Sequence, residues 1–303
     1  MGKSRILWLS VGAALLTIAL KFSAYIFTGS VGLLSDAAES LVNLAAAIFA
    51  LIALQIASQP PDDEHRFGHD KAEYFSSGAE GILILVAAAV IVYSAVERLL
   101  NPQAISQLGW GLAISLVASC VNLWVARILL RAAQRYDSIT LEADAHHLMT
   151  DVWTSVGVVS GLAVVSITGW QLLDPIIAIV VALNIVRTGL QLVVRSVRGL
   201  MDFALPPGEV TLIEEVLARY RSEYVTYHAL RTRKAGPRRF VDLHLLVDGR
   251  ISVNEAHGLC NRIEEDIKAE LGQVVVTIHV EPAADKTAWI DDFVPETAVT
   301  EGL

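Results

Sequence analysis

The sequence predicts a membrane protein with six transmembrane α-helices and a C-terminal α+β domain. The first observation is composition: of 303 residues, 54% are hydrophobic and 18% are charged, against roughly 25% charged in soluble domains. The mean hydropathy is +0.52. The second is a series of apolar segments, each long enough for the about 20 residues that a spanning helix needs. The third is a change of pattern after Asp202, where shorter amphipathic and alternating segments follow.

The apolar segments occupy the first two thirds of the chain, at 6–27, 32–57, 77–99, 108–132, 141–168 and 172–197. The links at 28–31 and 169–171 are short and contain Gly, so segments one and two, and five and six, are expected to form antiparallel pairs. No convincing cleavage site follows the N-terminal apolar run, and more apolar segments come after it. We therefore interpret this run as the first span and not as a signal peptide.

Lysine and arginine predict the orientation, because cytoplasmic loops carry an excess of them. They precede the first segment, lie between the second and third, and end the fourth and sixth: Lys3, Arg5, Arg66, Lys71, Arg127, Arg131, Arg135, Arg195 and Arg198. The opposite links carry only Arg98. Both termini and the loop from Gln59 to Glu73 are therefore expected to be cytoplasmic.

The residue pattern of the C-terminal part predicts helices and strands in the order α-β-β-α-β. Two prolines after Leu205 end the last span, and residues 209–220 have the pattern of an amphipathic helix. Residues 227–233 and 239–247 alternate like strands, 253–271 is again helical, and 273–282 is a strand that Pro282 ends. The expected domains are a transmembrane domain at 1–204, an α+β domain at 205–284, and a tail at 285–303 that is acidic, aperiodic and expected to be disordered.

Ionisable and polar side chains interrupt the second and fifth apolar segments. His147 and Asp151 are four residues apart, and Asp36, Glu39 and Asn43 follow at i, i+3 and i+7, so each set shares one helical face. Such groups are costly inside a bilayer and indicate a functional site. We predict that Glu39, Asn43, His147 and Asp151 bind one divalent cation. The alternative is a polar contact that only joins the two helices.

The remaining polar residues of the apolar segments are harder to assign. Asp36 lies nearer the outer end and competes with the four predicted ligands or serves the entrance to their site. His146 points about a quarter turn away from His147. Glu80 and Arg187 also lie inside apolar segments. A buried ion pair is the default interpretation for Arg187.

Two further groups have the composition of metal sites outside the membrane. Asp62, His65 and His69 recur at spacings of three and four in the loop after the second segment, and the alternative there is a solvated charged loop. The other group lies in the C-terminal domain and consists of His228, His244, His257, His279 and Glu281. This group contains four of the eight histidines of the chain, which favours a metal site. The alternative is that these histidines are scattered over the surface of the domain.

Several function classes are disfavoured. A net charge of −9 makes nucleic acid an unsuitable partner. Cys120 and Cys260 form no C-x-x-C pair, so neither a disulfide framework nor a thiolate metal site is expected. A membrane metalloenzyme usually shows H-E-x-x-H, which the sequence lacks, so we expect no enzyme. A membrane-anchored metal sensor would not need polar residues in two different spans.

The sequence resembles the cation diffusion facilitator family, close to its bacterial zinc- and iron-exporting members. Four motifs occur in the family's order and cover nearly the whole chain except the tail. They are Gly29-Ser-Val-Gly-Leu-Leu-Ser-Asp-Ala, Phe67-Gly-His-Asp-Lys-Ala-Glu73, His147-x-x-x-Asp151, and the pair Leu230-Arg-Thr-Arg-Lys-Ala-Gly with Asp242-Leu-His-Leu.

The resemblance implies a homodimeric six-helix transporter of the bacterial inner membrane with a metallochaperone-like cytoplasmic domain. It implies export of a divalent metal in exchange for protons by alternating access. The metal ion is then both the substrate and a structural ion of the protein, and no cofactor is expected. It places the transport ligands on Glu39, Asn43, His147 and Asp151. It also implies a loop site and a commonly binuclear cytoplasmic site on the two groups named above, and a dimer salt bridge between Lys71 and Asp202.

One departure from the family concerns the metal. Zinc exporters usually carry Asp or His where Glu39 stands and Asp where Asn43 stands, so this site has one negative charge fewer. Zinc is the first expectation because the cytoplasmic group is rich in histidine. Iron(II), cobalt and manganese remain alternatives, since oxygen ligands with one imidazole suit all of them.

Overall fold

The computed structural model describes residues 3–28, 31–101, 110–170 and 172–285, apart from the side chains of some helical residues, among them 31–39 and 161–166. The chain divides into two units, Met1–Leu200 and Met201–Leu303, and each is described by itself. Of the tail predicted at 285–303, only Asp285 is described, so that prediction falls almost entirely outside the described residues.

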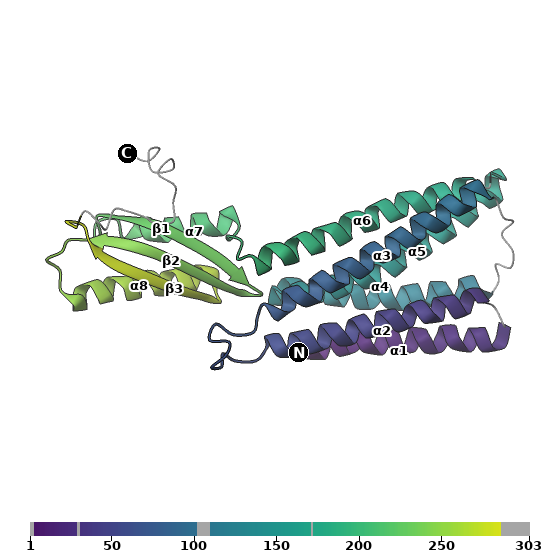
Figure 1. Cartoon of the computed structure of the whole chain (residues 1–303), viewed down its shortest axis with the longest axis horizontal. Coiled ribbons are helices and arrows are strands. Elements are labelled where there is room, and N and C mark those ends of the chain that lie inside the picture. Colours follow the sequence, from purple (N-terminus) through teal and green to yellow (C-terminus); the bar gives the residue numbers. More distant parts are fainter. Residues whose placement is uncertain (1–2, 29–30, 102–109, 171, 286–303) are drawn as a thin grey trace. The chain divides into compact units, whose positions relative to one another are not determined.

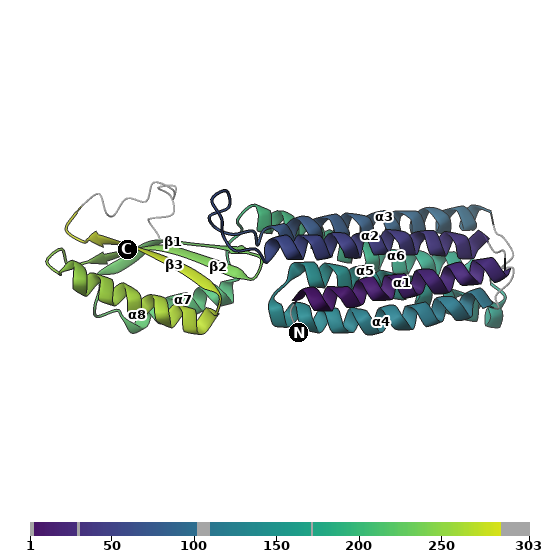
Figure 2. The same cartoon turned by 90° about the horizontal axis from the view of Figure 1, so that it is seen from below.

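The first unit is a bundle of long helices that lie alongside one another (Figures 1 and 2). They are α1 (Lys3–Thr28), α2 (Val31–Ala57), α3 (Ala72–Leu100), α4 (Trp110–Tyr136), α5 (Ile139–Thr168) and α6 (Leu173–Leu200). Each begins and ends within a few residues of its predicted segment. In the described part of the chain, α1, α3, α4 and α6 contain windows long and apolar enough to cross a membrane, and α2 contributes a shorter one, Asn43–Ala57.

Helix α5 belongs to both apolar cores of this bundle. Leu141 and Leu148 of α5 pack with buried residues of α1, α2 and α4, including Leu7 and Leu54. Ala143, on another face of α5, packs with buried residues of α3 and α6. The buried polar residues of α5 therefore lie between packed helices, where each needs a hydrogen-bond partner or a ligand. They are Thr140, Asp144, His147 and Thr150.

Helices α3 and α6 approach closely at a pair of glycines. A Cβ atom on Gly81 would lie 2.9 Å from Val193 Cγ2 and 3.1 Å from the carbonyl oxygen of Gly189. The small residues of these two segments therefore serve close helix packing, as they commonly do in membranes.

Large apolar side chains cover the outside of the bundle, as a lipid-facing surface requires. Examples are Ile52, Val86 and Leu183, which are 48%, 55% and 61% exposed. Arg187 is also exposed, so the buried ion pair predicted for it is wrong. Glu80, in contrast, is buried.

The second unit has the predicted αββαβ order. It consists of α7 (Pro207–Arg219), β1 (Thr226–Ala235), β2 (Arg238–Val247), α8 (Val253–Leu271) and β3 (Val274–Pro282). The strand order is β1-β2-β3, with β1 antiparallel and β3 parallel to β2 (Figure 1). Ser252 and Glu255 form a capping box that fixes the start of α8.

Both helices of this unit pack on one face of the sheet. Ile213 of α7 and Ile263 of α8 belong to the same core as Val241, Leu243 and Leu245 of β2. Because side chains alternate along a strand, the residues between these three point to the opposite face. His244 is one of them, so the helices leave its face of the sheet uncovered.

Candidate metal centres

Asn43 connects α2 to the His-Asp pair of α5. Its amide oxygen lies 2.8 Å from Nε2 of His147, and its Nδ2 donates to Asp151 Oδ2 at 2.7 Å. Asn43 and His147 are buried. The structure thus brings together three of the four residues predicted for the membrane site.

His147 presents its Nε2 atom to the other members of this site. Since the oxygen of Asn43 accepts, Nε2 of a neutral His147 carries the proton. Nδ1 is buried and has no hydrogen-bond partner among the described residues. A cation shared with Asn43 and Asp151 would bind Nε2, with the ring proton moved to Nδ1.

Glu39, the fourth predicted ligand, lies on α2 one turn before Asn43. The side chains of Glu39 and Asp36 lie outside the described part, so their roles stay predictions. His146 turns away from this site, as expected. Its Nε2 lies 3.9 Å from Glu142, whose carboxylate pairs with Arg195 of α6.

Asn122 of α4 is a member of this site that sequence reasoning missed. Its Nδ2 donates to Asp151 Oδ2 at 2.9 Å, and its side chain is buried. The two amides of Asn43 and Asn122 therefore orient one carboxylate oxygen and leave its negative charge in place. A signal was present, since Asn122 is an amide in an apolar segment just as Asn43 is.

The loop group converges as its spacing predicts. Asp62 Oδ2 lies 3.3 Å from His69 Nε2, and Asp62 Oδ1 lies 3.4 Å from His65 Nδ1. One ligand atom from each residue lies within 4.8 Å of the others. The backbone amide of His65 donates to Asp62, which is the main reason that the pKa of this carboxyl is lowered. An ionised carboxylate next to two imidazoles fits a divalent cation.

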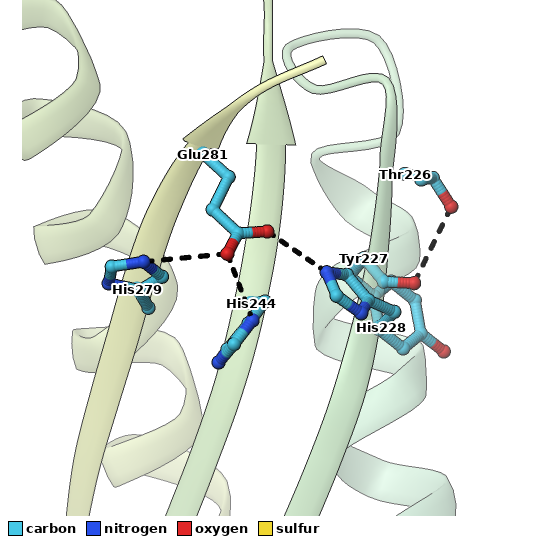
Figure 3. A network of polar contacts seen from close by, with 6 residues as sticks. All are labelled: Thr226, Tyr227, His228, His244, His279 and Glu281. Carbon is cyan, nitrogen blue, oxygen red and sulfur yellow. Dashed lines mark hydrogen bonds and ion pairs between the residues drawn. The ribbon is translucent and has the colours of Figure 1, made fainter. Parts of the chain in front are cut away.

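The C-terminal group is built on neighbouring positions of the three strands. His228 of β1 pairs with His244 of β2, which pairs with His279 of β3. The carboxylate of Glu281 lies among the three rings (Figure 3). Oε2 is 3.0 Å from His228 Nε2, while Oε1 is 3.2 Å from His244 Nδ1 and 3.4 Å from His279 Nε2.

These distances allow a metal at the C-terminal group. One ligand atom each from His228, His244 and Glu281 lies within 4.8 Å of the others, and His279 joins through Glu281. The structure does not bring His257 to them. It is exposed on α8, where its Nε2 lies 3.2 Å from Asn261, and α8 packs on the other face of the sheet. A single chain therefore does not support the predicted fifth ligand.

Each residue of the predicted dimer salt bridge contacts a residue of its own unit. Lys71 Nζ lies 3.4 Å from the carbonyl oxygen of Leu200, and Asp202 lies 3.3 Å from Arg233 Nη1. The dimer salt bridge between Lys71 and Asp202 stays a prediction.

Two family models match almost the whole described chain. The cation efflux transmembrane domain matches residues 7–201, and the cytoplasmic domain of cation efflux proteins matches residues 205–283. The chain belongs to the cation diffusion facilitator family. As a cation diffusion facilitator, it is a multi-pass membrane transporter for the efflux of divalent metal cations and not an enzyme.

Individual relatives agree over nearly their full lengths. An uncharacterized transporter of Synechocystis sp. is 50% identical, over 95% of this chain and 93% of its own. The cation-efflux pump FieF of Shewanella oneidensis is 32% identical, over 90% and 92%. Among solved structures, the metal-bound C-terminal domain of the CzcD transporter from Thermotoga maritima is 30% identical, covers 27% of this chain and 99% of its own, and has a TM-score of 0.25.

Proposed function

We propose that this cation diffusion facilitator exports Zn²⁺ in exchange for protons, by alternating access. The observation that carries the proposal is the convergence of Asn43, His147 and Asp151 from α2 and α5, with Asn43 and His147 buried. It provides an imidazole nitrogen and oxygen ligands within the apolar bundle. Glu39, one turn from Asn43, is the proposed fourth ligand.

Metal and protons compete for this site because a ligand must be deprotonated to bind a metal. The Nε2 atom of His147 and the carboxylate of Asp151 are the two groups that either can occupy. When the metal leaves, protonation of these groups replaces its charge. The hydrogen bonds from Asn43 and Asn122 keep Asp151 in position in both states.

Zinc is favoured over the alternatives by the C-terminal group. Three imidazoles and one carboxylate form a donor set typical of zinc. A zinc ion there would replace the contacts between Glu281 and the three histidines with metal–ligand bonds and join the three strands. We propose that such an ion stiffens the domain and favours the homodimer. Iron(II), cobalt and manganese are alternatives that the neutral amide of Asn43 leaves open.

The proposed location is a bacterial inner membrane, with both termini and the C-terminal unit in the cytoplasm. The excess of Lys and Arg on one set of loops supports this orientation. The loop group with Asp62 then lies on the side from which the metal is taken.

The test is transport by purified protein in liposomes, with a metal-sensitive dye inside. Asp151→Asn keeps the shape of the side chain and removes its charge, so we expect at least about a tenfold loss of zinc transport, as for an altered metal ligand. Glu97→Gln, an exposed carboxylate on α3, is the matched control and should transport normally. Competition with iron(II), cobalt and manganese ranks the substrates. Normal zinc transport by Asp151→Asn or Asp151→Ala would refute the site.

A further inference from the structure

Two carboxylates outside the proposed metal centres are buried in the helix bundle. Glu80 of α3 and Asp144 of α5 are each 1% exposed. Among the described residues, both oxygens of Glu80 and Oδ2 of Asp144 have no hydrogen-bond partner. The fourth oxygen, Asp144 Oδ1, accepts a hydrogen bond of 3.0 Å from Ser10 of α1.

Glu80 and Asp144 lie on helices that pack against each other, and the two carboxylates carry the same sign. In the described part of the chain no ion pair joins either of them to a cation. On α6, Arg195 pairs with Glu142, and Arg187 is exposed. On α3, Glu73 lies two turns before Glu80 and accepts a hydrogen bond from Ser138.

Two further helices, α2 and α4, pack on α5 and carry titratable residues of their own. Helix α2 carries Asp36 and Glu39, whose side chains are not described. On α5 itself, His147 follows Asp144 by three residues and lies on the same helical face. The arginines of α4 at 127, 131 and 135 are exposed, and none forms an ion pair with Asp144 within the described residues.

Two ionised carboxylates cannot share this environment at acceptable cost. A buried charge without a partner loses its hydration, and a second like charge nearby adds repulsion. Inside a bilayer such residues commonly serve proton relays. A proton bound to either group removes one charge and supplies a donor where the group otherwise has none.

We propose that Glu80 and Asp144 form a proton-binding site that supplies a counter-transported proton, separate from the metal ligands. The inference rests on the proposed metal–proton exchange. A proton leaves water for a carboxylate oxygen on one side of the membrane, and its O–H bond breaks to return it to water on the other side. Because Asp144 and the metal ligand His147 share one face of α5, a movement of that helix changes both sites together.

The experiment measures protons and metal in the same liposomes, with a pH-sensitive and a zinc-sensitive dye. Glu80→Gln and Asp144→Asn preserve size and remove the titratable groups. Each should lower the transported protons by about one per metal ion, while zinc still binds the purified protein with unchanged stoichiometry. Glu97→Gln, the exposed carboxylate on the same helix as Glu80, should leave the ratio unchanged. An unchanged ratio in Glu80→Gln would overturn the proposal.

Infrared difference spectra between high and low pH supply a measurement that does not depend on transport. The proposal predicts the carbonyl band of a protonated carboxyl group in the folded wild-type protein and its loss or shift in both variants. If neither variant changes that band, the pair binds no proton and the proposal is wrong. If wild-type protein moves zinc without protons, the proposed exchange fails. In that case the infrared spectra alone test whether Glu80 and Asp144 bind a proton.

Discussion

Asn122 provides the sharpest single test of the membrane site, because it touches Asp151 without being a proposed ligand. Its Nδ2 donates to the same carboxylate oxygen as Asn43 does, at 2.9 Å. Asn122→Ala removes this hydrogen bond and keeps every proposed ligand. A hydrogen bond to a charged group contributes about 1.5–3 kcal/mol. Only part of that is lost on metal binding, since water or Asn43 can replace the donor.

We therefore expect zinc binding and transport to weaken by roughly 10-fold, in the range seen when groups that orient metal ligands are removed. The assay is zinc titration of the purified protein together with the half-saturation concentration for transport. Cys120→Ala is the control on the same helix. Its side chain is exposed, on the outside of the bundle. Wild-type zinc affinity in Asn122→Ala would refute the conclusion that this amide positions Asp151.

Two other predictions concern the C-terminal group and the helix packing. Glu281→Gln removes the carboxylate that contacts His228, His244 and His279, so the full-length protein should bind about one metal ion fewer. Glu265→Gln, at an exposed position of α8, is the control. Unchanged metal stoichiometry in Glu281→Gln would exclude this site. Gly81→Ala places a methyl group 2.9 Å from Val193 and should lower the unfolding free energy by about 1–3 kcal/mol, seen as a lower melting temperature in detergent. Gly12→Ala, with open space around its Cβ, should not lower it, and equal melting of the two variants would contradict the close α3–α6 contact.

The sequence predicts features that depend on local spacing better than those that depend on packing. His147 and Asp151 are four residues apart on one helix, so their common face follows from helix geometry alone. The contact with Asn43 requires a particular pairing of α2 and α5, and it was predicted because polar groups in both apolar segments need partners. At helical spacing Asn122 has serines, Ser115 and Ser119, and no ionisable neighbour, so its role depends on how α4 packs against α5.

In the C-terminal group, too, local spacing predicts some features and helix packing decides others. The alternation in β2 and β3 indicates which side chains share a face, and the register places His228, His244 and His279 side by side. His257 was grouped with them because it is a nearby histidine in the sequence. Which sheet face α8 covers is decided by burial of Leu259 and Ile263, and that burial leaves His257 apart from the other histidines.

The central claim is that the transported ion binds between α2 and α5. An anomalous difference map at the zinc edge, from crystals of zinc-loaded protein, tests it most directly. We expect a peak within bonding distance of His147 and Asp151, about 2.0–2.2 Å from their ligand atoms, and its absence in Asp151→Asn. Peaks confined to the loop and C-terminal groups, under conditions in which the same protein transports zinc, would contradict the claim.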